Sequence, residues 1–233
     1  MQRWKRRALI GGCAAIVVVV GGLLAIHLIQ GTGDPPLTFI DTSTTVAAGD
    51  TTSPPTTTLA SLDGTWKITS GSTAGYRVKE TLFGQSATAT GRTTAVTGEF
   101  TLAGTSVSTA SFSVDLTQVS SDRSQRDGQF QGRIMQTSQF PTATFVLTKP
   151  IDIGSVPANG VEITPKATGK LTLHGVTKTV TIALTAKRTG NTIQVLGSLP
   201  ITFADYNIND PSGGPATVGK TGTLEFLLVL LRV

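Results

Sequence analysis

Histidine sets the first limit on the chemistry that this sequence could perform. His27 and His174 are its two histidines, and His27 lies in an N-terminal apolar run. A Ser-His-Asp triad would therefore have to use His174 as its base. Because Gly175 follows His174 at the corner of a predicted hairpin, the favoured interpretation is a structural ring bonded to turn backbone. We predict no catalytic residue and no enzymatic activity.

Metal and thiol sites have equally little support. The single cysteine, Cys13, lies in the same apolar run, so the rest of the chain holds no thiol nucleophile and no Cys ligand. No carboxylate pair stands at ligand spacing beside His174. Glu80 and Glu99 could act as a glycosidase pair, but the sequence does not bring them together. No metal and no cofactor are predicted.

The best polar pair is Arg126-Asp127, within a polar segment at 121–139 that we expect to form a loop with a short helix. The favoured interpretation is a salt bridge or helix cap that stabilises this segment. The alternative is a lid that contacts the head group of a ligand. Glu80 is likewise either a solvated strand residue or the polar end of a channel.

The elements that position these side chains begin with an N-terminus typical of a membrane anchor. Residues 8–29 are almost all apolar, and a helix of this length spans ~33 Å. Residues 1–7 form a strongly basic tail that should stay in the cytoplasm, which places the rest of the chain outside. The sequence predicts a single-pass protein of the cell membrane with an extracytoplasmic domain.

Three other interpretations of the N-terminus have weaker support. A cleaved signal peptide typically has a shorter apolar core and a small-x-small cleavage site. Residues 26–30 do not contain such a site. This alternative stays open. A lipoprotein signal would use Cys13, but too few apolar residues precede it. Arg6-Arg7 forms part of a twin-arginine signal, which is a weak pattern by itself.

Residues 30–61 are rich in Thr, Ser, Pro and Gly and predict a disordered linker. The small apolar group at 37–40 is interpreted as a stray patch in this tether, with contact to the membrane interface as the alternative. The net charge is +5, but the densest basic cluster adjoins the membrane segment. We therefore predict no nucleic-acid partner, and the sequence does not indicate a protein partner.

The remaining residues, 62–233, show short strands separated by turns. Apolar residues alternate with Ser, Thr or Asp at 110–116 and 179–186. The strand candidates are 65–70, 74–83, 92–103, 106–117, 142–149, 161–174, 177–188 and 192–203, with a further one at 222–232. The glycines that suit the turns between them are Gly91, Gly104, Gly175 and Gly190. This pattern indicates an antiparallel barrel or sandwich.

The final strand is apolar on both faces at 224–231, whereas a sandwich strand normally has one solvated face. Either another element covers its outer face, or one face lines an apolar cavity. The pattern alone does not decide between them.

Several motifs in a compatible order resemble the YceI-like family of lipid- or polyisoprenoid-binding domains, over roughly 62–231. The most specific is the hairpin LTLHGVTKTVTI at 171–182. The others are Trp66-Lys67-Ile68, Gly98-Glu99-Phe100, Ala110 to Leu116, Arg126-Asp127, and Phe140-Pro141 with Phe145. The chain departs from the family at Glu80, where many members have a histidine. This departure puts any histidine-dependent contact to a head group in doubt.

The resemblance implies an extended, lipocalin-like antiparallel barrel of eight strands with one short helical insertion. It implies that an isoprenoid, quinone or similar lipid is the partner, held in an apolar interior. The implied apolar lining is Phe112, Val114, Phe145, Leu171, Ile182, Leu184, Phe203, Phe226 and Leu228. The implied polar end is Glu80, Arg126 and Asp127. The alternative is an envelope interaction or structural module whose interior is filled by side chains.

Overall fold

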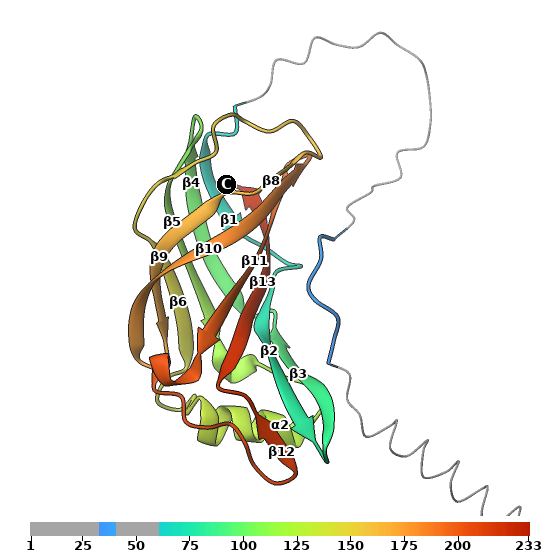
Figure 1. The fold of residues 1–233 in the computed structure, drawn as a ribbon. Helices are drawn as coiled ribbons and strands as arrows, with labels where there is room; N and C mark the ends of the chain where they lie inside the picture. The colour runs from blue at the N-terminus through green and yellow to red at the C-terminus, as the bar shows by residue number, and fades with distance from the viewer. Residues whose placement is uncertain (1–32, 41–60) are drawn as a thin grey trace, which may run out of the picture.

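The computed structural model describes residues 33–40 and 61–233, and Figure 1 shows their arrangement. All strand pairings among these residues are antiparallel, within one sheet of 13 strands. The strands are β1 (Gly64–Ile68), β2 (Thr73–Leu82), β3 (Gln85–Thr93), β4 (Val96–Ala103), β5 (Ser106–Asp115), β6 (Thr142–Leu147), β7 (Ile151–Asp152), β8 (Glu162–Ile163), β9 (Lys166–Leu173), β10 (Val176–Thr189), β11 (Thr192–Thr202), β12 (Ala216–Val218) and β13 (Thr221–Arg232).

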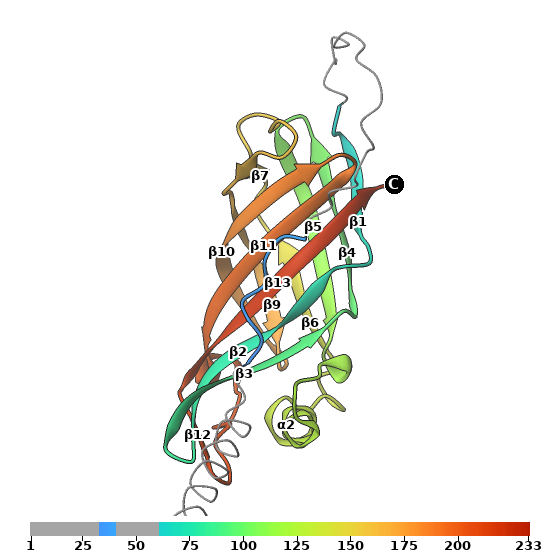
Figure 2. The ribbon, with the colours of Figure 1, turned by 90° about the vertical axis from the view of Figure 1, so that its right-hand side faces the viewer.

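Eight of these strands close into a barrel. Their order around it is β1, β4, β5, β6, β9, β10, β11 and β13, and the pairing of β1 with β13 completes the ring. β2 pairs with a different part of β13 and forms a long hairpin with β3 that extends beyond the ring (Figures 1 and 2). The predicted eight-stranded antiparallel barrel is confirmed.

The polar segment at 121–139 provides the short helix that the sequence predicts. Helix α2 (Ser124–Gln129) continues into one π-helical turn, Phe130–Ile134. Together with β12 and the tip of the β2–β3 hairpin it lies at one end of the barrel, which we call the α2 end (Figure 1). The opposite end, which holds β8 and the turn at Gly190, is called the far end.

Three of the four predicted turn glycines are confirmed. Gly104, Gly175 and Gly190 lie in hairpin turns with positive φ. The prediction for Gly91 is wrong, because this residue lies inside β3. A Cβ on Gly91 would come within 2.4 Å of the Tyr76 ring, so the glycine is needed for close packing of that ring.

Two strand predictions need correction. The expected strand 92–103 is divided, since β3 ends at Thr93 and β4 begins at Val96. The expected strand 161–174 is interrupted between β8 and β9 at Pro165, whose missing N–H cannot join the ladder. Most of β3 was not predicted, because its small Ser, Ala, Thr and Gly residues lack large alternating apolar side chains.

Buried apolar side chains form two clusters, one toward each end of the barrel. Phe130 and Phe203 belong to the cluster at the α2 end. Trp66, which is fully buried, belongs to the other and stacks on Phe100 with ring centroids 6.2 Å apart. Val114 of β5 packs against both clusters, so it marks the waist of the barrel.

Residues 33–40, which the sequence assigns to a disordered linker, instead lie extended along the outside of the barrel (Figure 2). We call them the strap. The side-chain amide of Gln194 accepts a hydrogen bond from the Ile40 N–H and donates one to the Ile40 carbonyl, both at 2.8 Å. At the other end of the strap, the Gly33 N–H donates to the Thr88 carbonyl at 3.0 Å. Hydrogen bonds at both ends of the strap hold it against the outside of the barrel.

The strap also bears on the two-sided apolar character of β13. Leu224, Phe226 and Leu228 face the interior, while Val229 is buried on the outer side. A Cβ on Gly71 would lie 3.3 Å from Ile40 and 3.5 Å from Val229, so the strap packs beside this outer face. The final strand therefore has both predicted features: its inner face lines an apolar cavity, and another element, the strap, covers its outer face.

The described residues contain no helix long and apolar enough to cross a membrane. The predicted membrane helix at 8–29, the basic tail at 1–7 and the remainder of the linker lie outside the described residues.

Candidate functional site

The interior of the barrel holds a cavity of about 880 Å³. Its lining extends from Ile163 and Arg188 at the far end to Phe83 and Pro215 at the α2 end, and most of it is apolar. Pockets that bind small organic ligands measure roughly 300–1,000 Å³. The volume and the elongated lining fit a slender apolar ligand.

Every apolar residue that the sequence assigns to the lining borders this cavity. Their strands alternate inward and outward with a period of two, so one face of each strand supplies the wall. The nine are Phe112, Val114, Phe145, Leu171, Ile182, Leu184, Phe203, Phe226 and Leu228. Their position is as expected, and their contact with a ligand stays a prediction.

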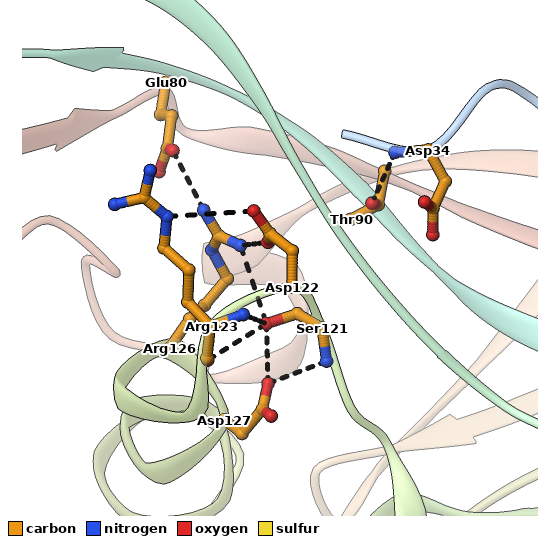
Figure 3. Close-up of polar contacts among 8 residues, drawn as sticks. All are labelled: Asp34, Glu80, Thr90, Ser121, Asp122, Arg123, Arg126 and Asp127. Atoms are coloured by element: carbon orange, nitrogen blue, oxygen red, sulfur yellow. Dashed lines mark hydrogen bonds and ion pairs between the residues drawn. The ribbon is translucent and has the colours of Figure 1, made fainter. Parts of the chain in front are cut away.

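A polar group borders the cavity at the α2 end (Figure 3). Glu80 projects inward from β2, and its Oε1 lies 3.4 Å from Nη2 of Arg126 on α2. Arg126 also pairs with Asp122 through Nη1. The Glu80 and Arg126 side chains are only 8% and 16% exposed. This ion pair presents polar atoms to the cavity, whose lining at this end also includes Arg123 and Arg133.

Asp127 lies behind this polar group, away from the cavity, and its contact with a ligand stays a prediction. Its Oδ1 accepts hydrogen bonds from the backbone N–H of Ser121 at 2.8 Å and from the Ser121 hydroxyl at 2.6 Å. It does not border the cavity. Asp127 thus ties the start of the helical segment together. The Ser121 hydroxyl that it binds also accepts a long hydrogen bond, 3.5 Å, from Nη1 of Arg126, whose Nη2 reaches Glu80 (Figure 3).

Tyr76 belongs to the same end of the cavity, and it was not among the predicted site residues. Its ring stacks on Phe130 with centroids 5.1 Å apart. Burial raises the pKa of the Tyr76 phenol to about 12, the charge of Arg126 lowers it, and nearby carboxylates, including Glu80, raise it further. The phenol is therefore a neutral, apolar part of the wall at physiological pH.

This environment predicts the alkaline titration of the protein. In a Tyr206→Phe variant, which leaves Tyr76 as the single tyrosine, we expect ultraviolet absorbance to report phenolate formation near pH 12 instead of the 10.0 of a free tyrosine. Folding raises the pKa of Tyr76, and this shift contributes to the free energy of unfolding. The contribution is fully present below about pH 10 and is lost as the pH rises toward 12. Titration near 10 without unfolding would contradict this burial.

The other residues considered for catalysis or metal binding make structural contacts instead. His174 is buried in the β9–β10 turn, and its Nδ1 lies 3.0 Å from the Tyr206 carbonyl oxygen, so its ring is bonded to backbone as expected. Glu99 is on the outside of the barrel, paired with Lys67 at 3.8 Å, and does not share a site with Glu80. Within residues 33–40 and 61–233, no group of three His, Cys, Asp or Glu could hold a metal ion.

A closed antiparallel barrel around an elongated apolar cavity defines the class of ligand-enclosing β-barrels. Several solved structures share the fold. A polyisoprenoid-binding domain from Saccharophagus degradans, implicated in plant cell wall breakdown, is 20% identical, with a TM-score of 0.59 over 73% of this chain and 99% of that one. BcnA of Burkholderia cenocepacia is 22% identical, with a TM-score of 0.51 over 70% and 95%.

A family-level comparison identifies the barrel further. The YceI-like domain matches residues 66–230, which is most of the chain. The protein therefore belongs to the YceI-like domain family. A search of curated protein sequences finds no match.

Proposed function

We propose that the barrel binds a long-chain isoprenoid, quinone or similar lipid, with the tail in the cavity and the polar end beside Glu80 and Arg126. The observation that carries this proposal is the apolar cavity of about 880 Å³. Transfer of a lipid tail into it removes apolar surface from water, at roughly 25 cal/mol per Å². The polyisoprenoid-binding domain of Saccharophagus degradans shares the fold and supports the same class of ligand.

The open interior favours binding over the alternative of a purely structural module. A module of that kind would fill its barrel with side chains at the density of an ordinary core. The proposed role has no chemical step, so the ligand is cargo. That the protein is not an enzyme stays a prediction.

The proposed place of action is outside the cytoplasm, with the chain anchored by the predicted helix at 8–29. The basic residues at 1–7 support this orientation through the positive-inside rule. Protease added to intact cells after removal of any outer barrier should digest the barrel and spare residues 1–7. Protection of the barrel would contradict the orientation.

The binding proposal is tested on full-length protein purified in mild detergent from the membrane of its own host. Organic extraction and mass spectrometry of the released lipid should identify a long-chain species at close to one molecule per chain. The matched control is an unrelated single-pass protein purified in the same way, which reveals carried-over bulk lipid. Repeated recovery of barrel with no lipid beyond this background would contradict the proposal.

A further inference from the structure

Phe83, at the tip of the β2–β3 hairpin, is an aromatic side chain left in solvent. It is 67% exposed, and among the exposed large hydrophobic residues of the described chain it is the one aromatic. It occupies a two-residue turn with Gly84, at φ values of 49° and 78°. Such turns favour Asn or Asp before the Gly, and a bulky residue at positive φ is uncommon. An exposed aromatic in a turn that disfavours it indicates a role at the surface.

The two chain segments that contain Phe83 and Pro215 carry no charge of their own. The Phe83 N–H donates to the Pro215 carbonyl at 3.2 Å, which joins the hairpin tip to the loop before β12. Neither 81–86 (TLFGQS) nor 211–217 (PSGGPAT) contains a charged residue. Phe83 and Pro215 both border the cavity. An apolar rim at Phe83 and Pro215 therefore lies where the cavity reaches the surface at the α2 end. Beside it is one basic side chain, Arg133, which donates to the Pro211 and Ser212 carbonyls and also borders the cavity.

The strap leads the chain toward this same rim. Ile40 is held by Gln194 of β11, and Gly33 is held by Thr88 of β3. Figure 2 shows the strap crossing β13 and β2 toward β3 as the residue numbers fall. Thr88 lies five residues from Phe83 along β3, about 17 Å at strand spacing. The chain therefore leaves the barrel near the α2 end, on its way to the N-terminus.

The length of chain before the strap limits how far the barrel can be from the membrane. Three residues, 30–32, separate Gly33 from the end of the predicted membrane helix at Ile29. Four residue steps span at most about 14 Å when fully extended. If the strap remains bound, the α2 end is held close to the bilayer, and the far end points away.

We propose that the strap holds the α2 end against the outer surface of the membrane, with Phe83 inserted at the lipid interface. Lipid then passes between bilayer and cavity through the rim of Phe83 and Pro215 without crossing open water. Aromatic side chains favour this interface, and a neighbouring basic side chain such as Arg133 is compatible with anionic head groups. The inference rests on the proposed function and on the predicted anchor, and it adds a specific membrane-docking surface.

The test places a fluorophore at two matched sites in the full chain. In a Cys13→Ser background, Phe83→Cys or Val161→Cys is labelled with an environment-sensitive dye and reconstituted in phosphatidylcholine–phosphatidylglycerol vesicles with quencher lipids. Val161 is the control because it is exposed, apolar and adjacent to β8 at the far end. We expect strong quenching at position 83 and little at 161. Equal quenching, or more at 161, overturns the proposal.

A pair of insertions tests whether the strap sets this orientation. A flexible Gly-Ser segment of about twenty residues between Gln30 and Gly33 adds a reach of about 25 Å and should reduce quenching at position 83 at least about twofold. The same segment inserted within 41–60, after the strap, should leave quenching unchanged. An equal response to both insertions, or no response to the first, overturns the role of the strap.

The two proposals are separated by measuring bound lipid in the same samples. Lipid in the barrel without quenching at position 83 would overturn the docking surface and leave lipid binding intact. Quenching at position 83 with an empty barrel would support the docking surface while contradicting the proposed cargo.

Discussion

Replacement of Val114 with tryptophan should reduce occupancy of the barrel by a long-chain lipid at least about tenfold, or roughly 1.4 kcal/mol. Val114 borders the cavity and packs against both buried clusters. Next to it, the rings of Phe112 and Phe145 stack with centroids 6.5 Å apart. These two rings already narrow the cavity at this level. An indole at the waist would therefore divide one long chamber into two short ones.

The division predicts a dependence on ligand length, which a general loss of folding would not produce. Isoprenols of graded length, offered to purified protein and quantified by mass spectrometry, should lose binding in order of chain length, the longest first. The control is Ser111→Trp, which adds the same side chain to the exposed outer face of β5. Unchanged retention of the longest chain by the Val114→Trp variant would show that the ligand does not pass the waist.

The sequence predicted the cavity wall well because the wall depends on local periodicity. In β5 and β10, Ser and Thr alternate with Phe, Val, Ile and Leu, so the inward face is readable without any tertiary contact. Once an eight-stranded barrel is assumed from family resemblance, inward residues such as Phe112 and Ile182 become wall residues. The existence of empty space between them is not readable, because it depends on how the strands curve.

The polar end was harder to predict because its contacts join distant segments. Arg126 and Asp127 are adjacent in sequence and both contact Ser121, yet Arg126 alone also reaches Glu80 on β2. Neighbouring helical side chains point in different directions, so adjacency does not predict which of the two borders the cavity. Tyr76 could have been suspected only from Gly91, whose missing side chain makes room for its ring across the β2–β3 hairpin.

The contacts of the strap were also hard to predict, because they join residues that are even further apart in the sequence. Ile40 and Gln194 are 154 residues apart, and no local pattern links a Pro- and Thr-rich stretch to a glutamine on β11. The useful signal was the two-sided apolar strand at 224–231, which indicated that something could cover its outer face. That signal did not identify the covering segment, although the apolar group at 37–40 is part of it.

A buried ion cluster joins the strap to the barrel and carries the largest expected effect on stability. Glu225 of β13 has a side chain that is 7% exposed, with Oε1 2.7 Å from Nη2 of Arg92 and Oε2 3.4 Å from Nε of Arg77. Nη2 of Arg77 also donates to the Asp34 carbonyl at 2.7 Å, and Nη2 of Arg92 donates to the Pro35 carbonyl. Glu225 is therefore the buried carboxylate shared by two arginines that also bind the strap. The exposed Asp34 carboxylate adds a longer pair, 3.7 Å from Nη1 of Arg92.

Glu225→Gln should lower the free energy of unfolding by about 3–5 kcal/mol, because it leaves two largely buried guanidinium groups with no counter-charge except the exposed Asp34 carboxylate beside Arg92. Urea unfolding of the full chain in detergent, followed by circular dichroism, measures this change. The matched control is Glu99→Gln, whose exposed pair with Lys67 should contribute at most about 1 kcal/mol. Because both arginines also bind the strap, limited proteolysis should cut the Glu225→Gln variant near Asp34 faster than the control. Equal stability of the two variants would mean that Asp34 and the strap carbonyls, and not Glu225, compensate the arginines.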